Sequence, residues 1–398
     1  MTMPPHLPQK KRRERLARLL RRLRPQSLPV TWRHNRVVLF SDGERFFRTL
    51  FAAIRSARHA VLLEYYIIRN DRTGAVFAEE LAAAAHRGVR VVLIYDYIGC
   101  LETPAAYFKT LEQQGVLLLP FNIPSFRRGV GWFDKRDHRK MAIIDGSLAL
   151  LGGINIADEY AGLSEEHRRF RDMGFSICGT AVQELVLLFR ETWLLEKNQA
   201  LPLGELRDAH PERHHGKAGI SLVSGGPHQR SSYIRNAFLV NIAASSEELL
   251  IVSPYFVPGP RIIRGLLRAA RRGVRVRLLL PARSDVPLVR LVGRSFYGTL
   301  LAGGIEIYEL EREILHAKVM LVDRERTLIG SANLDQRSFH RNFEINAVID
   351  SADFGDQIRT MLEQDFAASR RITIVDHERR GLTTRLLEKI VSLFAWFL

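Results

Sequence analysis

Two stretches of the chain repeat one pattern of reactive residue types, H-x-K-x4-D-x6-G-[GS]-x-N. The first copy consists of His138, Lys140, Asp145 and Gly152-Gly153-Ile154-Asn155, and the second of His316, Lys318, Asp323 and Gly330-Ser331-Ala332-Asn333. A single H-x-K would be weak support for a site. Two copies with equal spacing, at matching places of a repeated sequence, predict one site built from both.

The residue types of the two copies suit attack on a phosphate diester. Alternate residues of a strand point to one face, so the His and Lys of each copy should face the same way. One imidazole can attack phosphorus, the other can protonate the leaving oxygen, and the lysines can neutralise the phosphate oxygens. We expect the amides of Asn155 and Asn333 and the hydroxyl of Ser331 to bind the phosphate.

The elements that must position these residues also occur twice. Residues 85–91 match residues 270–276, and in each case a helical pattern runs through Gly into an apolar strand. Strands alternating with helices predict α/β lobes. We therefore expect two duplicated lobes, each with a mostly parallel central sheet flanked by helices, related by a pseudo-twofold axis around one shared site. The expected segments are an arm (1–30), lobe one with a linker (31–215), lobe two (216–375) and a terminal helix (376–398).

Composition limits the class of protein. The chain has 398 residues, 59 Lys and Arg, 43 Asp and Glu, and a formal net charge of +16. Hydrophobic residues at 46% and charged residues at 26% exclude wholesale disorder. The basic excess predicts a polyanionic partner, either nucleic acid or an anionic membrane surface. Two cysteines exclude a disulfide framework and favour a reducing compartment.

No transmembrane span and no metal site are expected from the sequence. No apolar run reaches the roughly 18 residues that a membrane span needs, and arginines interrupt any signal-peptide core. A linker cluster of His210, His214 and His215 has no acid or cysteine at a spacing that would complete a metal site.

With its doubled motif, the chain resembles the phospholipase D superfamily from about residue 33 to residue 375. Within it, the chain is most similar to bacterial cardiolipin synthases, in particular the B type. The supporting stretches are residues 63–66, 255–259, 270–276, 285–290 and 330–335. One departure is Gly153, which stands where the second copy has Ser331, so a phosphate contact from that hydroxyl is expected on one side only.

The resemblance implies a ping-pong mechanism without metal or other cofactor. One motif histidine forms a phosphohistidine, and the other acts first as acid and then as base. The commoner family order makes His138 the nucleophile and His316 the acid and base, although the symmetric motif does not decide this. In the family an acid downstream of each motif orients its histidine, and Asp172 and Glu344 hold the places after the first and second motif.

Asp145 and Asp323 complete the motif and are counted with the catalytic residues. We nevertheless expect them to support the fold rather than touch substrate.

The implied reaction is transfer of a phosphatidyl group between two phosphatidylglycerol molecules, with release of glycerol. Three alternatives stay open: a phospholipase D that hydrolyses lipid or uses another headgroup alcohol, a nucleic-acid phosphodiesterase, and a non-catalytic protein that binds anionic membranes. The intact motifs argue against the last. Nothing in the sequence indicates an obligate protein partner.

Both termini predict a membrane surface rather than nucleic acid as the polyanion. In the arm, Leu19, Leu20 and Leu23 form one face and Arg18, Arg21 and Arg22 lie between them, which is typical of an interfacial helix. The arm between Lys10 and Arg24 lacks the aromatic residues that stack on bases. At the other end, Trp396 and Phe397 close an apolar helix face.

We expect peripheral attachment to the cytoplasmic face of a bacterial inner membrane. A solubilising arm and a terminal helix packed on the protein are the alternatives. Residues 125–133, which mix aromatic residues with arginines, are expected either to line the mouth of the site or to form an ordinary loop.

Overall fold

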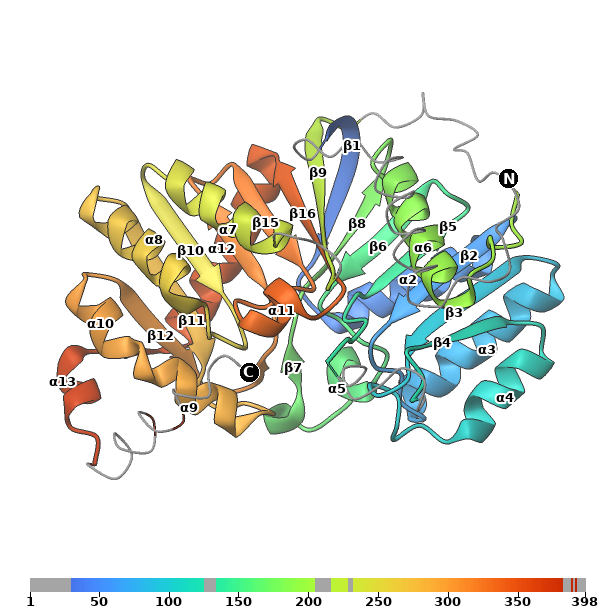
Figure 1. Ribbon diagram of the computed structural model, residues 1–398, viewed down its shortest axis with the longest axis horizontal. Coiled ribbons are helices and arrows are strands. Elements are labelled where there is room, and N and C mark those ends of the chain that lie inside the picture. Colours follow the sequence, from blue (N-terminus) through green and yellow to red (C-terminus); the bar gives the residue numbers. More distant parts are fainter. Residues whose placement is uncertain are drawn as a thin grey trace, which may run out of the picture.

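The computed structural model describes residues 30–124, 134–204, 216–227 and 232–381, together with Glu388 and Val391. Two lobes, each of strands and helices, lie next to each other (Figure 1). Lobe one contains β1 (Thr31–Phe40), α2 (Gly43–Ser56), β2 (Ala60–Tyr65), α3 (Arg72–His86), β3 (Arg90–Asp96), α4 (Ala105–Gln113), β4 (Leu117–Phe121), β5 (Met141–Ile144), β6 (Leu148–Gly152), α5 (Asp158–Ala161), β7 (Phe170–Arg171), β8 (Gly174–Cys178) and α6 (Val182–Lys197).

Lobe two repeats this succession with a few additions. It contains β9 (Ala218–Gly225), α7 (Tyr233–Ala244), β10 (Glu248–Val252), α8 (Gly259–Arg271), β11 (Arg275–Pro281), α9 (Pro287–Ser295), α10 (Tyr297–Ala302), β12 (Glu306–Leu310), β13 (Ile314–Leu315), β14 (Val319–Val322), β15 (Arg326–Gly330), α11 (Gln336–His340), β16 (Glu344–Asp350), α12 (Ala352–Ala367), β17 (Arg370–Ile372) and α13 (Ile374–Glu378). The described part of lobe one starts with β1 at Thr31 and that of lobe two just before β9.

The strands of both lobes join into one sheet with the order β17-β12-β11-β10-β14-β15-β16-β9-β1-β8-β6-β5-β2-β3-β4. Outward from the central pair, the order is β9-β16-β15-β14-β10-β11-β12 in lobe two and β1-β8-β6-β5-β2-β3-β4 in lobe one, so corresponding strands occupy corresponding places. Strands β1 and β9 pair in the antiparallel sense, as a twofold axis between the lobes requires. The expected duplicated α/β lobes are therefore confirmed, with β17 as an additional edge strand of lobe two.

The expectation of mostly parallel sheets is wrong. In lobe one, β2–β3 and β3–β4 are parallel, whereas β1–β8, β8–β6, β6–β5 and β5–β2 are antiparallel. For the pair β5–β6, the reason is the short connection between the two strands. Residues 145–147 join β5 to β6, and so short a turn can join antiparallel neighbours only, since a parallel pair needs a crossover of about a dozen residues.

Helices cover both faces of this sheet, which buries the motif strands completely. One apolar core is shared by the two lobes and includes residues of α6 and α12. On the opposite face, α2 and α3 pack on lobe one, and α7 and α8 pack on lobe two. Every residue of β5 and of β14 is buried, so the residues that precede these strands start from fixed positions. Among the described helices, none is long and apolar enough to cross a bilayer.

Several segments singled out in the sequence fall outside the described residues. These are residues 125–133, the cluster of His210, His214 and His215, and the predicted membrane contacts Arg18, Leu19, Leu20, Arg21, Arg22, Leu23, Trp396 and Phe397. Two residues near the C-terminus are described. Val391 packs against Val257, Val289 and Val292 of lobe two, and Glu388 accepts a hydrogen bond from Arg380. At Val391 the terminal segment packs on lobe two, as the alternative interpretation expects, whereas the contact of Glu388 lies within the terminal segment.

Candidate active site

Two extended segments bring the motif side chains to the junction of the lobes. His138 and Lys140 directly precede β5, and His316 and Lys318 directly precede β14. All four side chains are buried, and His138 is the most exposed of them at 8%. The charge of Lys318 reaches both His138 and Lys140 across the junction. The structure thus brings both copies of the motif into one site.

Each motif histidine is paired with a carboxylate of the other lobe. His138 Nδ1 lies 3.1 Å from Glu344 Oε2, and His316 Nδ1 lies 2.6 Å from Asp172 Oδ2. The two acids named from the sequence are therefore at the site, but each serves the opposite motif. The expectation that an acid orients the histidine of its own motif is wrong.

Short parallel contacts between the lobes cause this exchange. Strand β7 pairs with β13, and Arg171 lies opposite Leu315, so the next residues, Asp172 and His316, come together. An equivalent bridge joins Asp137 to Phe343 and brings Glu344 to His138. The partners are 144 and 206 residues apart in the chain, which puts them beyond the reach of any local sequence pattern.

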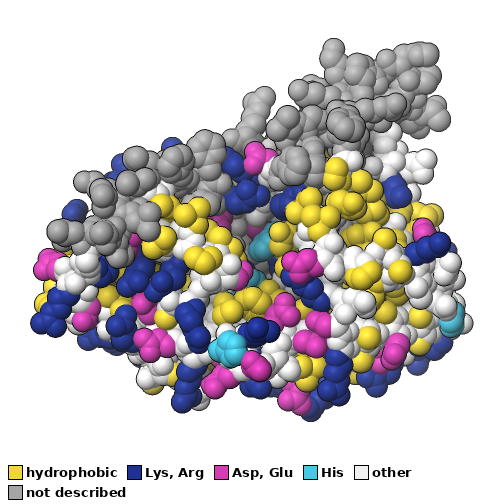
Figure 2. Space-filling view, turned by 90° about the horizontal axis from the view of Figure 1, so that it is seen from below, with side chains coloured by type: hydrophobic (Ala, Val, Ile, Leu, Met, Phe, Trp, Pro, Cys, Tyr) yellow, Lys and Arg dark blue, Asp and Glu magenta, His cyan; other side chains and the backbone are white. Residues whose placement is uncertain are grey.

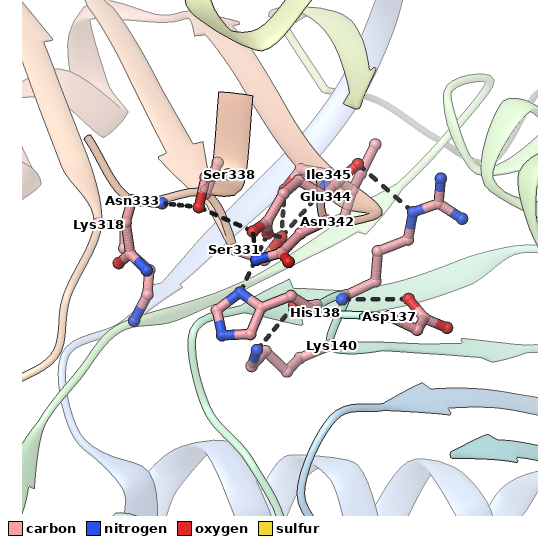
Figure 3. A network of polar contacts seen from close by, with 12 residues as sticks. Asp137, His138, Lys140, Lys318, Ser331, Asn333, Ser338, Asn342, Glu344 and Ile345 are labelled. Carbon is pink, nitrogen blue, oxygen red and sulfur yellow. Dashed lines mark hydrogen bonds and ion pairs between the residues drawn. The ribbon is translucent and has the colours of Figure 1, made fainter. Parts of the chain in front are cut away.

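Glu344 is held by three hydrogen-bond donors of lobe two. Ser331 Oγ donates to Oε2 at 2.6 Å, while Ser338 Oγ and Asn342 Nδ2 donate to Oε1 at 2.9 and 3.2 Å. Figure 3 shows these side chains around the carboxylate, with the His138 ring beside it. Ser331 was expected to bind phosphate, but its hydroxyl is used to hold Glu344. This position therefore supports the acid rather than the substrate.

Asp172 is held more simply, and this explains the departure at Gly153. Its Oδ1 accepts a hydrogen bond from the backbone N–H of Met173 at 2.7 Å, and the ammonium of Lys318 lies 3.6 Å from Oδ2. A Cβ atom on Gly153 would lie only 2.4 Å from both carboxylate oxygens of Asp172. The first motif copy therefore has no room for the serine that the second copy has at Ser331.

Burial and charge set the protonation of the site. Burial lowers the pKa of His138 to about 4, although Glu344 opposes this, and burial together with Lys318 lowers the pKa of His316. Burial also lowers the pKa of Lys140 to about 7. Burial alone would raise the pKa of Asp172, but the charges of Lys318 and His316 outweigh it and lower that pKa. The free site thus holds His138 as a neutral imidazole, with the ionised carboxylates of Asp172 and Glu344 beside the two histidines.

The two motif asparagines differ in their surroundings. Asn155 Nδ2 donates to the Tyr160 hydroxyl at 2.9 Å, and its Oδ1 accepts a hydrogen bond from the Ile67 backbone N–H. Asn155 is thus part of the framework of lobe one. Asn333 Oδ1 is buried and accepts no hydrogen bond from the described residues. Phosphate binding by either amide stays a prediction.

Asp145 and Asp323 have a structural role, as expected. Asp145 accepts hydrogen bonds from the backbone N–H groups of Arg58, His59 and Ala60, where β2 begins. Asp323 accepts from residues 246–248, where β10 begins. Neither carboxylate points to the histidines, so counting these two residues as catalytic was wrong.

We expect Asp145→Asn to lower stability and to leave the chemistry intact. The variant keeps a side chain that tolerates the positive φ of 51° at this position, but it loses the charge that three N–H groups share. The free energy of unfolding should fall by about 1 to 3 kcal/mol, which urea unfolding would measure. Asp353→Asn, on an exposed helix turn, is the control. A normal unfolding curve together with a large loss of kcat would contradict the structural role.

A buried charged cluster beneath His138 was not foreseen from the sequence. Arg139 Nη1 lies 3.2 Å from Glu64 Oε1, its Nε donates to the Glu344 backbone carbonyl, and its guanidinium lies over the Phe343 ring. Burial and the Glu64 charge raise the pKa of Asp137. These contacts tie the first motif to the start of β16. The signal in the sequence was Glu64, an acid in the middle of an apolar strand.

The charged cluster has no counterpart in lobe two. Glu64 faces Met141, the third residue after His138, and Val252 faces Val319, the third residue after His316. Val252 therefore replaces Glu64, and Leu315 and Ala317 replace Asp137 and Arg139. The two halves of the site have the same motif residues, but only the half in lobe one has buried charged residues packed next to its motif.

Aromatic rings line the approach to the histidines. The Tyr66 ring lies 4.9 Å from the His138 ring, and Tyr160, Phe170 and Tyr255 lie 5.4, 5.1 and 6.4 Å from the His316 ring. Figure 2 shows histidine side chains in a hollow between the lobes, with hydrophobic side chains gathered beside it on both. The hollow can therefore admit a molecule with both a polar and an apolar part.

Comparison with known proteins identifies the family. The model of the family described as cardiolipin synthase, PLD-like domain, matches residues 50–186 and 238–366, which carry both motif copies. The chain belongs to this family. A cardiolipin synthase of Geobacillus thermodenitrificans is 35% identical over 370 residues, covering 92% of this chain and 73% of that protein. Cardiolipin synthase A of Pseudomonas putida is 36% identical over 369 residues, covering 91% and 75%.

A solved structure supports the fold. The phosphatidylserine synthase of Haemophilus influenzae superposes with a TM-score of 0.71 at 13% identity, covering 97% of this chain and 99% of that one. The family model and the relatives confirm the resemblance to phospholipase D-type enzymes, and this structure supports the duplicated α/β fold. The relatives include a cardiolipin synthase 2 of Bacillus anthracis, 33% identical over 89% of this chain and 69% of its own length, besides the A-type protein. The B type stays a prediction.

Proposed function

We propose that this protein is a cardiolipin synthase that joins two phosphatidylglycerol molecules through a phosphohistidine and releases glycerol. One observation carries the proposal. Two buried imidazoles, each with its own carboxylate, share one site with two buried lysines. Such a set can attack a phosphate diester, protonate its leaving oxygen and bind its charge. Family membership and the named cardiolipin synthase relatives support the lipid substrate.

In the first step, Nε2 of His138 attacks phosphorus and forms an N–P bond. The bond from phosphorus to the glycerol oxygen breaks, and His316, which enters this step protonated and paired with Asp172, gives its Nε2 proton to that oxygen. In the second step, the hydroxyl of another phosphatidylglycerol gives its proton to His316 and attacks phosphorus. The N–P bond then breaks, and cardiolipin leaves with His138 restored.

The assignment of His138 as nucleophile is supported by the difference between the two half-sites. Burial lowers the pKa of His138 to about 4, so its ring is neutral and can attack. His316 lies 2.6 Å from Asp172, whose charge opposes the lowering of the His316 pKa by burial and Lys318 and so favours the imidazolium that a general acid needs. The same carboxylate fixes which ring nitrogen of His316 faces the substrate.

Attachment to the surface of an anionic membrane, at the cytoplasmic face, is part of the proposal. The basic arm of residues 1–30 supports it, with nine Lys or Arg against one acid. A lipid substrate has to enter the site from a bilayer, and the hydrophobic side chains beside the hollow fit that approach (Figure 2).

Vesicles of phosphatidylglycerol test the proposed reaction. We expect the purified protein to produce cardiolipin and free glycerol in equal amounts. Phosphatidic acid as the sole lipid product would indicate a hydrolase instead. Cleavage of DNA without any turnover of lipid would indicate a nucleic-acid phosphodiesterase. Binding to the vesicles without turnover would indicate a non-catalytic membrane protein.

We expect kcat/KM to fall on both sides of a plateau. Below a pH of about 4, His138 is protonated and cannot attack. On the alkaline side, His316 loses the proton that the leaving oxygen needs, and above a pH of about 7 Lys140 loses the charge that attracts the phosphate. A single ionisation changes the rate by about tenfold per pH unit on either limb. A melting curve at each pH separates titration from unfolding. A kcat/KM that stays level through the alkaline range would contradict the role of Lys140.

A further inference from the structure

An exposed carboxylate stands at the mouth of the site on the side of His316. Asp285 follows β11 and is exposed to solvent. The hydroxyl of Tyr255 donates to Asp285 Oδ2 at 2.6 Å. The Tyr255 ring in turn stands edge-on to the His316 ring, with 6.4 Å between the centroids. A hydrogen bond and a ring contact thus connect Asp285 to the acid and base of the reaction.

The charge of Asp285 reaches into the site. Burial lowers the pKa of His316 and that of Lys318, and the charge of Asp285 works against both shifts. Burial raises the pKa of Tyr160, and Asp285 adds to that rise. Tyr160 and His316 belong to opposite lobes, so the negative charge of Asp285 influences groups on both sides of the junction between the lobes.

Lobe one has no such carboxylate at the equivalent position. Arg90 in β3 and Arg275 in β11 lie opposite the first residues of their neighbours β2 and β10, so they correspond to each other. Counting from this pair, the counterpart of Asp285 is Cys100. Cys100 is buried, and its Sγ faces the Tyr66 carbonyl. The carboxylate therefore distinguishes the half of the site that contains His316.

A carboxylate is an unfavourable neighbour for an anionic phosphate diester, but it is a good acceptor for hydroxyl groups. An ionised carboxylate has no hydrogen to donate and can accept several hydrogen bonds. The lysines Lys140 and Lys318 already provide the positive charge for the phosphate. A ligand of Asp285 should therefore carry hydroxyl groups next to the reacting phosphorus. A polyol headgroup, such as the glycerol of phosphatidylglycerol, has this chemistry.

We propose that Asp285, held by Tyr255, binds the free hydroxyl of the attacking polyol headgroup while a second hydroxyl of that headgroup faces His316. This inference rests on the proposed transfer reaction and names the binding site for its acceptor. Asp285 is in this view a specificity-determining residue. It orients the acceptor and takes no proton from it. It should favour a polyol over water or a monohydric alcohol, neither of which has a second hydroxyl to offer.

A competition between two alcohols tests the inference. The full-length protein is given phosphatidylglycerol vesicles with equal concentrations of labelled glycerol and 1-propanol. The measured quantity is the ratio of labelled phosphatidylglycerol to phosphatidylpropanol. We expect Asp285→Ala to lower this ratio by at least about tenfold, because a site built to bind a hydroxyl discriminates strongly against an alcohol that lacks it. Formation of phosphatidylpropanol itself should change little.

Two further variants make the test specific. Tyr255→Phe keeps the ring and removes the hydroxyl that holds Asp285, so the ratio should fall in the same direction by less. Asp353→Ala removes an exposed acid on α12 and should leave the ratio unchanged. Asp285 is exposed, so its replacement should not disturb folding, and melting temperatures check this.

Each result decides between the possibilities. A ratio in Asp285→Ala equal to that of the unmodified protein would overturn the inference. An equal loss of glycerol and propanol transfer at an unchanged melting temperature would also overturn it, because Asp285 would then serve the reaction in general. If the unmodified protein transferred phosphatidyl groups to no alcohol, the proposed function would fail and this inference with it. If the unmodified protein transfers phosphatidyl groups to an alcohol, a negative result in Asp285→Ala therefore counts against this inference alone and not against the proposed function.

Discussion

Replacing either motif histidine by alanine is expected to abolish cardiolipin formation. Without His138 no N–P bond can form, and without His316 the glycerol oxygen has to leave without a proton. Loss of a residue that acts as part of such a unit lowers kcat by about 10⁴-fold or more. The measurement is cardiolipin formed from phosphatidylglycerol vesicles by each variant. Both side chains lie at the junction of the lobes, so a melting curve must show that each variant is folded.

His86→Ala is the matched control for this experiment. His86 is exposed in the last turn of α3, and its loss should leave turnover unchanged. The covalent intermediate provides a second readout. Stopping the reaction early in alkali and mapping the modified peptide should locate the phosphatidyl group on His138. An adduct on His316 would reverse the two roles, and a fully active variant of either histidine would refute the mechanism.

The exchanged carboxylates lead to the second expected result. Asp172→Asn and Glu344→Gln should each lower kcat by about 10²- to 10⁴-fold, as the loss of a carboxylate behind a catalytic histidine does elsewhere. Replacing Asp172 should affect the same reaction step as replacing its partner His316, and replacing Glu344 should affect the same step as replacing His138. A substrate whose leaving group needs no proton distinguishes the pair of His316 and Asp172, which it makes dispensable for the first step, from the pair of His138 and Glu344.

Phosphatidyl-p-nitrophenol is such a substrate. A burst of p-nitrophenolate should survive in His316→Ala and in Asp172→Asn, because the nucleophile His138 still works. The burst should be lost in His138→Ala and strongly slowed in Glu344→Gln. The double variant His316→Ala with Asp172→Asn should be no slower than the worse single variant, since the two act as a unit. Loss of the burst in Asp172→Asn and its survival in Glu344→Gln, while the burst is lost in His138→Ala and survives in His316→Ala, would refute the exchange.

Much of the active site could be predicted from the sequence, because its chemistry requires particular side chains at particular spacings. Two equal copies of a His–Lys pattern indicate phosphate chemistry and a duplicated fold, and both the duplicated fold and the family were confirmed. The structural role of Asp145 and Asp323 also follows from their position at the end of the motif strand. There a carboxylate meets the free N–H groups of the neighbouring strand.

The direction of the strands was less predictable. The helix–strand alternation of residues 60–121 describes one part of each lobe correctly, and there the strands are parallel. The motif strand β5 and the next strand β6 form an antiparallel pair because only residues 145–147 join them. The pattern of apolar residues predicts each strand, but by itself it does not predict whether neighbouring strands run in the same direction.

The sequence by itself determined which residues perform the chemistry and that there are two sets of them. Only the tertiary structure decided how they are combined. Glu344 supports His138 because Asp137 pairs with Phe343 across the lobes, and Asp172 supports His316 because β7 pairs with β13. Ser331 holds Glu344, and Gly153 leaves room for Asp172, because neighbouring antiparallel strands of one lobe bring them together. The two histidine–carboxylate contacts join residues far apart in the chain, and they depend on how two folded lobes meet rather than on any local pattern.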